Sequence, residues 1–299
     1  MKARRLGSGV VLLALAFYLL PCDSFATTPP PGSFYPVPQN APHVSAGVNG
    51  VKVPNFPDGQ RLKATDVSPW YGAYPPDRAE SAVYQASWNG IPVASASIDA
   101  APVQLDGKEF YRVQVQARSW RYLDPIWRMR DTIEAIFDYK MLHPRRFVFR
   151  QRENSKIIDT TANFDPGSNQ WLVHRQQGRK VKEYQFVSRD TWDPISATYL
   201  ARSLDFVVGD TLVLEVFGGK SRYQVSLDIV GRERISLKSG DFDAYRIVPR
   251  IRNLNRAGYA GRMRDATVWV SADPWRRPLR MVSRVFIGHV NIEMVEQRS

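Results

Sequence analysis

Hydrophobic and polar residues alternate with a period of two from Glu80 almost to the C-terminus. In the segment that follows Asp106-Gly107, Tyr111, Val113 and Val115 would share one face, with arginine and glutamine residues between them. Such alternation predicts antiparallel strands with one dry and one solvated face. Asp106-Gly107 itself is typical of a two-residue hairpin turn.

The same alternation recurs in segments separated by glycine, proline, asparagine and aspartate, which favour turns. Gly90-Ile91-Pro92 would break or bulge the first strand. We therefore predict a mainly β chain that forms a single large antiparallel curved sheet or open β-barrel of about ten to twelve strands. The expected strands cover residues 82–88, 93–98, 111–117, 146–152, 156–163, 170–175, 180–187, 211–216, 223–232, 243–252, 266–271 and 277–295.

Two segments are predicted to be short helical inserts. The first spans Pro125 to Phe137, where apolar residues recur every three or four positions and Asp124 can cap the first turn. The second begins after Asp193-Pro194 and has a mixed, mostly buried face that includes Ile195 and Tyr199.

The first 26 residues have the pattern of an export signal. Basic residues precede the apolar run Val10–Leu20, and Ser24-Phe25-Ala26 places small residues at the −3 and −1 positions of a cleavage site. The run is too short for a bilayer-crossing helix and Pro21 follows it, so no transmembrane span is expected after cleavage. We predict a soluble periplasmic protein that is cleaved after Ala26.

Cys22 is the only cysteine and allows an alternative localisation. It follows Leu19-Leu20-Pro21, so it would carry the lipid if the protein were an anchored lipoprotein. A proline directly before the cysteine disfavours that signal, and cleavage after Ala26 would leave a chain without disulfides.

Residues 27–79 differ in composition from the rest of the chain. They are rich in proline, with glycine, asparagine, serine and threonine between the prolines. Such a segment is expected to be a flexible leader, because it has too little apolar surface to offset the entropy of ordering. The predicted organisation is therefore a signal peptide (1–26), a proline-rich leader (27–79) and an antiparallel β domain (80–299).

The net charge of +12 raises the question of an anionic partner. Loss of Lys2, Arg4, Arg5 and Asp23 with the signal would lower it to +10. Arginine suits bidentate contacts with phosphate or carboxylate, so a lipid headgroup, lipopolysaccharide or acidic glycan is a candidate partner. The alternative is that the arginines decorate solvated strand faces, which their dispersion along the chain favours. Nucleic acid is not expected as a partner, because the sequence contains no familiar binding module.

Three motifs resemble a known family. They are Tyr84-x-x-x-Trp88-x-Gly90-Ile91-Pro92-Val93, the central Asp193-Pro194-Ile195-Ser196-Ala197-Thr198-Tyr199-Leu200-Ala201-Arg202, and Val268-Trp269-Val270-Ser271-Ala272-Asp273-x-x-Arg276-Arg277-Pro278-Leu279-Arg280 with Phe286-Ile287-Gly288 after it. Together they resemble the exported bacterial family called domain of unknown function 3108. The resemblance covers residues 80–296 and implies an exported, β-rich domain without an established activity. The design is also similar to periplasmic lipoprotein-carrier proteins, in which helices fill the concave face of an open sheet.

No catalytic, metal or cofactor site is predicted. The four histidines lack ligand spacing, and no nucleophile-elbow motif is present. Gly218-Gly219-Lys220-Ser221 resembles the end of a phosphate loop, but Leu214 replaces the required glycine, so a hairpin turn is expected. Asp241 and Asp243 fit a solvated loop better than a pair of catalytic carboxylates.

The leading hypothesis is a periplasmic, non-enzymatic protein that holds an apolar or amphiphilic ligand (a lipid or an acylated client) inside the barrel. Several tryptophans on a concave face would line such a cavity, although ordinary core packing is the favoured explanation for any one of them. The alternative is an interaction or structural protein of the cell envelope, without a small-molecule ligand. The candidate ligand-binding residues are Trp88, Trp120, Trp269, Arg276, Arg277 and Arg280.

Overall fold

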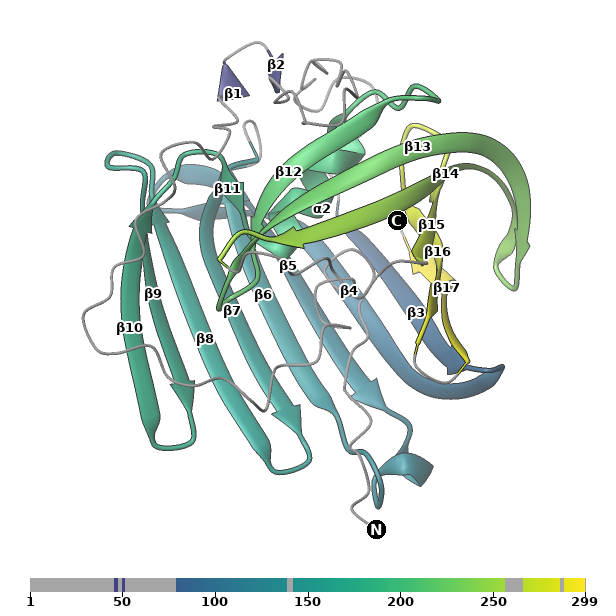
Figure 1. Ribbon diagram of the computed structural model, residues 1–299, viewed down its shortest axis with the longest axis horizontal. Coiled ribbons are helices and arrows are strands. Elements are labelled where there is room, and N and C mark those ends of the chain that lie inside the picture. Colours follow the sequence, from purple (N-terminus) through teal and green to yellow (C-terminus); the bar gives the residue numbers. More distant parts are fainter. Residues whose placement is uncertain are drawn as a thin grey trace.

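The computed structural model describes residues 46–47, 50–51, 79–138, 142–255, 266–285 and 288–298. Most of the described chain from Glu80 onward belongs to one 15-stranded sheet, which curves around helix α2 (Pro194–Ser203) (Figure 1). The predicted class, mainly β with a single large curved sheet, is confirmed. The predicted signal peptide, its cleavage site and Cys22 lie outside the described residues. So does the predicted leader, apart from residue 79 and a short antiparallel pair, β1 (Ala46–Gly47) and β2 (Gly50–Val51).

One wall of the sheet consists of eight strands that are neighbours in both sequence and space. Each pairs antiparallel with the next, and the register is set by turns such as Asp106-Gly107. The strands are β3 (Glu80–Trp88), β4 (Ile91–Leu105), β5 (Lys108–Ser119), β6 (Arg130–Asp138), β7 (Pro144–Glu153), β8 (Lys156–Asp165), β9 (Gln170–Gln177) and β10 (Lys180–Val187). Their alternating burial places one apolar face inside the curve.

The remaining strands extend the sheet from the other side of β3. The C-terminal β17 pairs antiparallel with β3, so the last strand lies beside the first strand of the wall. These strands are β11 (Thr191–Trp192), β12 (Thr211–Phe217), β13 (Arg222–Leu237), β14 (Gly240–Asn253), β15 (Ala266–Ser271), β16 (Pro278–Arg284) and β17 (His289–Arg298). A register shift between Ile229 and Gly231 interrupts the β13–β14 pairing, and this long hairpin bends around the molecule (Figure 1).

Side chains bridge the two edges of the open sheet. Phe217 at the end of β12 packs against Phe186 of β10 and Trp171 of β9, with ring centroids 5.2 and 5.8 Å apart. The Tyr184 hydroxyl donates a hydrogen bond to the Gly219 carbonyl at 3.0 Å. Aromatic packing therefore joins edges that no strand pairing connects among the described residues.

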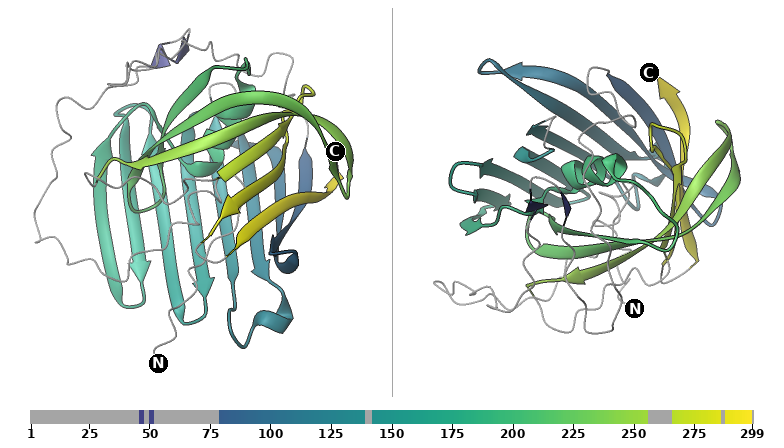
Figure 2. Two further views of the ribbon diagram at one scale, coloured as in Figure 1. Left: turned by 45° about the vertical axis from the view of Figure 1, so that its right-hand side comes forward. Right: turned by 90° about the horizontal axis from the view of Figure 1, so that it is seen from above.

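Helix α2 lies inside the curve of the sheet, as the view from above shows (Figure 2). The prediction of a helix after Asp193-Pro194 is confirmed. Asp193 caps the helix, its Oδ1 accepting from the backbone N–H groups of Ile195 and Ser196 at 2.9 and 3.1 Å. Nine of its ten residues are buried, because the sheet surrounds the helix.

The predicted helix over Pro125–Phe137 is wrong. The segment holds the end of a connection that contains the short 3-10 helix η1 (Arg121–Leu123), followed by most of strand β6. Its apolar residues fit two periods, and Met129, Ile133 and Phe137 are buried along an alternating pattern. Pairing with β5 and β7 satisfies the backbone hydrogen-bonding groups of β6, and this favours a strand over a helix. Ile126 lies before the strand and is exposed.

The described residues form fifteen strands in the sheet and one α-helix, against the ten to twelve strands and two helical inserts expected. Besides β6, the two-residue β11 was not anticipated, and the single strand expected over 277–295 is the pair β16 and β17. Gly288, with φ of +79°, lies in the turn between them, and its position against the Asn89 side chain leaves no room for a Cβ.

Candidate functional site

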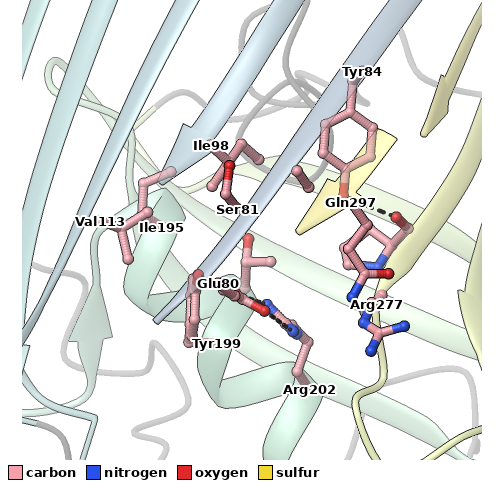
Figure 3. A pocket seen from close by; sticks show the side chains of 13 residues that line it. Glu80, Ser81, Tyr84, Ile98, Val113, Ile195, Tyr199, Arg202, Arg277 and Gln297 are labelled. Carbon is pink, nitrogen blue, oxygen red and sulfur yellow. Dashed lines mark hydrogen bonds and ion pairs between the residues drawn. The ribbon is translucent and has the colours of Figure 1, made fainter. Parts of the chain in front are cut away.

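A small pocket lies where α2 meets the beginning of β3, with a volume of about 50 Å³ (Figure 3). Its apolar lining comes from the concave faces of β3, β4 and β5 and from Ile195 of the helix. The charged residues of the lining are Glu80, Arg202 and Arg277, and a few uncharged polar side chains lie beside them. The pocket therefore combines an apolar wall with charged groups at its edge.

The one charged residue of α2, Arg202, is bonded to the first residue of β3. Arg202 donates from Nη1 and Nη2 to the two carboxylate oxygens of Glu80 at 2.8 and 3.0 Å. The Tyr199 hydroxyl donates to Glu80 Oε1 at 2.6 Å. Arg202 also donates to the carbonyl of Trp275 at 3.0 Å. These bonds attach the last turn of the helix to the edge of the pocket.

The Asp193 cap holds the other end of the helix in a fully buried position. Burial raises the pKa of Asp193 to about 6, and the hydrogen bonds from Ser196 and Ile195 oppose that shift. Ser196 Oγ donates to Asp193 Oδ2 at 2.7 Å. Both ends of the helix are thus held by polar groups within an apolar interior.

The loop between β15 and β16 forms the opposite edge of the pocket. Asp273 Oδ1 accepts from the Ser271 hydroxyl at 2.7 Å and from the Trp275 N–H at 2.9 Å, which orders the turn. The Arg277 guanidinium lies 3.6 Å from Asp273 Oδ2 and 4.9 Å from the Trp275 ring. This packing directs Arg277 to the pocket.

Tyr84 connects this loop to β3. Its hydroxyl donates to the Pro278 carbonyl at 2.9 Å, and burial raises its pKa. The tyrosine is therefore a neutral hydrogen-bond donor in the wall of the pocket.

The six residues proposed from the sequence do not form one site. Arg277 lines the pocket, whereas the neighbouring Arg276 packs its guanidinium over Phe206 and Tyr245, at 4.7 and 5.1 Å. Trp269 and Arg280 are cross-strand partners, and each alternates with inward-facing buried residues of its own strand. The indole of Trp269 donates to Glu233 at 2.6 Å, outside the pocket.

The other two tryptophans lie at the far end of the wall. Trp88 is the last residue of β3, and Trp120 follows β5 directly. Trp120 is 44% exposed, so it is not part of the interior core. The concave face near the pocket is lined by tyrosines and aliphatic side chains instead.

Sequence reasoning placed Tyr199 only on the buried face of the helix and gave no binding role to it, to Glu80 or to Arg202. A usable signal was present, because Arg202 lies in the last turn of a helix that otherwise consists of apolar, small and hydroxyl-bearing residues. A charged side chain in a buried helix needs a partner of opposite charge. The identity of that partner, 122 positions earlier, has no local signature.

The other sequence motifs and residue clusters give little support for a catalytic or metal site. Within the described ranges, no group of three or more His, Cys, Asp and Glu side chains is arranged to hold a metal ion. Gly218 and Ser221 form a hairpin turn with a 2.9 Å backbone hydrogen bond, as predicted. None of the described helices is long and apolar enough to cross a membrane.

Three solved structures with low sequence identity resemble the fold. A β-barrel-like protein of domain of unknown function DUF1849 from Brucella abortus has 8% identity and a TM-score of 0.47, with 73% of this chain and 96% of that chain covered. A candidate lipoprotein from Parabacteroides distasonis has 10% identity and a TM-score of 0.35, with coverages of 75% and 97%. A candidate exported protein with a YmcC-like fold from Bacteroides fragilis has 7% identity and a TM-score of 0.33, with coverages of 74% and 95%. These scores are too low to support an argument about function.

The family model gives a clearer result. None of the curated proteins matches the chain. The model described as "Protein of unknown function (DUF3108)" matches residues 83–295, which include nearly the whole large sheet, α2 and the loop that carries Arg277. The resemblance inferred from the three motifs is therefore confirmed, and the chain belongs to the DUF3108 family.

Proposed function

We propose that this protein is a periplasmic, non-enzymatic binding protein that holds an apolar or amphiphilic ligand, a lipid or an acylated client, between α2 and the concave face of the sheet. The observation that carries the proposal is the pocket beside α2, where an apolar lining meets Arg202 and Arg277. An acyl chain suits the apolar wall, and an anionic headgroup suits the two arginines.

The size of the pocket requires the site to open. A volume of about 50 Å³ holds a few water molecules. Sites for small ligands usually measure roughly 300–1,000 Å³. An acyl chain therefore needs α2 to move away from the sheet, and the Glu80–Arg202 pair is one of the contacts that oppose this movement.

The Glu80 carboxylate shows how Arg202 would bind a headgroup. Its two oxygens each accept one N–H of the guanidinium, the geometry that a fatty-acid carboxylate or a phosphate also adopts. A ligand headgroup would replace Glu80 at Arg202, with Arg277 as a second cation at the same pocket. The protein would then exchange an internal ion pair for an equivalent one with the ligand.

An extracytoplasmic location is supported by the N-terminal sequence. The basic start, the apolar run and Ser24-Phe25-Ala26 favour export and cleavage after Ala26. Attachment of a lipid to Cys22 is the alternative, and it would keep the same domain at a membrane.

Displacement of a fluorescent fatty acid tests the proposal. Glu80→Gln keeps the shape of the side chain and removes its charge, so it should strengthen binding of the probe by about tenfold, because a charged hydrogen-bond partner competes more strongly than a neutral one. Arg202→Met should abolish binding. Glu183→Gln is the matched control on an exposed strand face and should change nothing.

The wild-type protein should also release lipid on organic extraction after purification from the periplasm. Failure of both the wild type and the Glu80→Gln variant to bind the probe, with no lipid extracted, would overturn the proposal.

The exposed edge of the sheet favours a second function, an envelope interaction protein without a small-molecule ligand. Among the described strands β10 pairs with β9 alone, and Val181 and Val187 are exposed along it. Such an edge can accept a strand from a partner, although Lys180 and Lys182 oppose non-specific pairing. A photo-crosslinking residue at position 187 should capture a defined envelope protein in living cells if this function is correct.

A further inference from the structure

One end of the wall carries a surface that the proposed ligand site does not use. We name it the lower rim, and most of it lies at the bottom of Figure 1, with the β3–β4 turn at the lower right. It consists of the turns between β3 and β4, between β7 and β8 and between β9 and β10, together with the β5–β6 connection (residues 120–129). The pocket lies near the opposite end of the same strands, because Glu80 begins β3 whereas Trp88 ends it.

Large apolar side chains project from neighbouring parts of the lower rim. In the β5–β6 connection Ile126 is 75%, Tyr122 57% and Trp120 44% exposed. Ile91, at the start of β4, is 56% exposed. The two segments are adjacent, because the Trp120 N–H donates to the Val93 carbonyl at 3.0 Å and the Tyr122 hydroxyl donates to the Pro92 carbonyl. Exposed apolar groups gathered in this way mark an interaction surface.

Hydrogen bonds hold this surface in one shape. Arg130 donates to both carboxylate oxygens of Asp124, at 3.0 and 2.8 Å, and thereby ties the connection to the start of β6. The backbones of Arg128 and Asn154 are joined by a 2.8 Å hydrogen bond, and the Arg128 N–H also donates to the Asn154 side chain. The apolar side chains therefore project from a loop that hydrogen bonds hold in a fixed conformation.

The charges around the apolar side chains are positive. Arg118, Arg121 and Arg128 are exposed, and none of the three forms an ion pair with another described residue. The nearby acid Asp124 is already paired with Arg130. Arg179, Lys180 and Lys182 add exposed basic groups at the β9–β10 turn of the same rim. The surface is thus complementary to an anionic partner.

The geometry points to an anionic lipid surface as that partner. Tryptophan and tyrosine favour the headgroup layer of a bilayer, because their rings are apolar and carry one polar group. Arginines beside them would contact lipid phosphates, and attraction to an anionic surface contributes roughly fivefold in affinity for each basic residue. Trp120, Tyr122 and Ile126 would enter the headgroup layer, with Arg121 and Arg128 against the phosphates. This inference does not depend on the proposed ligand site.

Vesicle flotation tests it, with the processed protein recovered from cells and carrying Cys22→Ser, so that no lipid can be attached. Binding is expected to vesicles of phosphatidylcholine with phosphatidylglycerol, and not to phosphatidylcholine alone. Trp120→Ser/Ile126→Ser and Arg121→Glu/Arg128→Glu should each weaken binding by about tenfold or more. The matched controls Val207→Ser/Val208→Ser and Arg112→Glu/Arg146→Glu change exposed side chains of the same kinds elsewhere and should bind like the parent protein.

A fluorescent label identifies which face contacts the lipid. The Cys22→Ser protein has no cysteine, so an environment-sensitive dye can be attached through Ile126→Cys or, as a control, Val208→Cys. Emission from position 126 should shift to shorter wavelength on anionic vesicles, and emission from position 208 should not. The inference is overturned if the protein does not bind anionic vesicles, which is the result expected for a rim that contacts a protein. It is also overturned if rim and control variants bind the vesicles equally.

Discussion

Charged side chains at the two ends of the β3–β10 wall differ in burial and in ion pairing. At the upper end, beside α2, the buried Arg202 is paired with the largely buried Glu80, which also accepts a hydrogen bond from Tyr199. At the lower rim, Arg121 and Arg128 are exposed and lack ion pairs among the described residues. Buried charges require exact partners, whereas exposed ones contribute little to stability and remain available to bind. Stability should therefore depend on the upper end, and surface binding on the lower.

Loss of the buried arginine should have the largest effect. Arg202→Met leaves the Glu80 carboxylate without its main partner, so the free energy of unfolding should fall by about 3–5 kcal/mol, measured by urea denaturation. The double variant Glu80→Leu/Arg202→Met removes both charges and should recover a substantial part of that loss. Equal destabilisation by the single and double variants would show that packing, and not charge, is responsible.

Loss of an aromatic ring at the same end should come next. Phe217 is 1% exposed and joins the two edges of the sheet through Phe186 and Trp171. Phe217→Ala should lower the free energy of unfolding by about 3 kcal/mol and speed hydrogen exchange of β10. Ile157→Ala, on an exposed position of β8, is the control and should change the free energy little. An unchanged exchange rate in β10 would argue against a role for the ring in joining the edges.

A buried carboxyl near the lower rim should make stability depend on pH. Asp131 lies on the inner face of β6, and burial raises its pKa to about 7, with the neighbouring Glu153 raising it and the Arg152 N–H opposing the shift. Between the ordinary pKa of 3.8 and the raised value, the folded protein retains a proton that the unfolded chain has lost. The free energy of unfolding should therefore fall as the pH rises through this range.

Asp131→Asn should reduce this fall and make the protein more stable than the wild type at pH 8. Denaturant titrations between pH 5 and pH 8 measure both effects. Part of the fall should remain in the variant, because the pKa of Asp193 is also raised, to about 6. Asp106→Asn, in an exposed hairpin turn, should have the same pH dependence as the wild type. A steeper fall in Asp131→Asn would contradict the expectation.

The smallest effect on stability is expected at the rim surface. Ile126 is 75% exposed, so Ile126→Ser should change the free energy of unfolding by less than about 0.5 kcal/mol in urea denaturation. A loss of more than about 1 kcal/mol would mean that the side chain supports the fold, and would weaken the contrast between the two ends.

The comparison of β6 with α2 shows where sequence patterns suffice. The helix after Asp193 was predicted because a capping aspartate and a proline mark its first turn. The segment before Phe137 also has Asp124-Pro125, yet Asp124 binds Arg130 instead of capping a helix. The apolar residues of this segment fit both the helical period and the strand period of two. Hydrogen bonding to two neighbouring strands stabilises the strand.

The candidate site was predictable only in part. The loop with Asp273 and Arg277 was identified from its motif, and the structure places Arg277 at the pocket. Trp269 and Arg280 alternate with the buried residues of their strands, so alternation within β15 and β16 could have placed them on the outer face. The aromatic residues that line the pocket are Tyr84 and Tyr199, and none of the candidate tryptophans lines it.

By itself the sequence determined which side of most strands would be dry, where most hairpins turn, and that one helix begins after Asp193, since these properties depend on residues only a few positions apart. The pairing of β17 with β3, the aromatic contacts between the two edges and the Glu80–Arg202 ion pair depend on the folded arrangement of the whole sheet. Such contacts form between distant residues after the sheet has curved, and many other pairings satisfy the same alternation equally well.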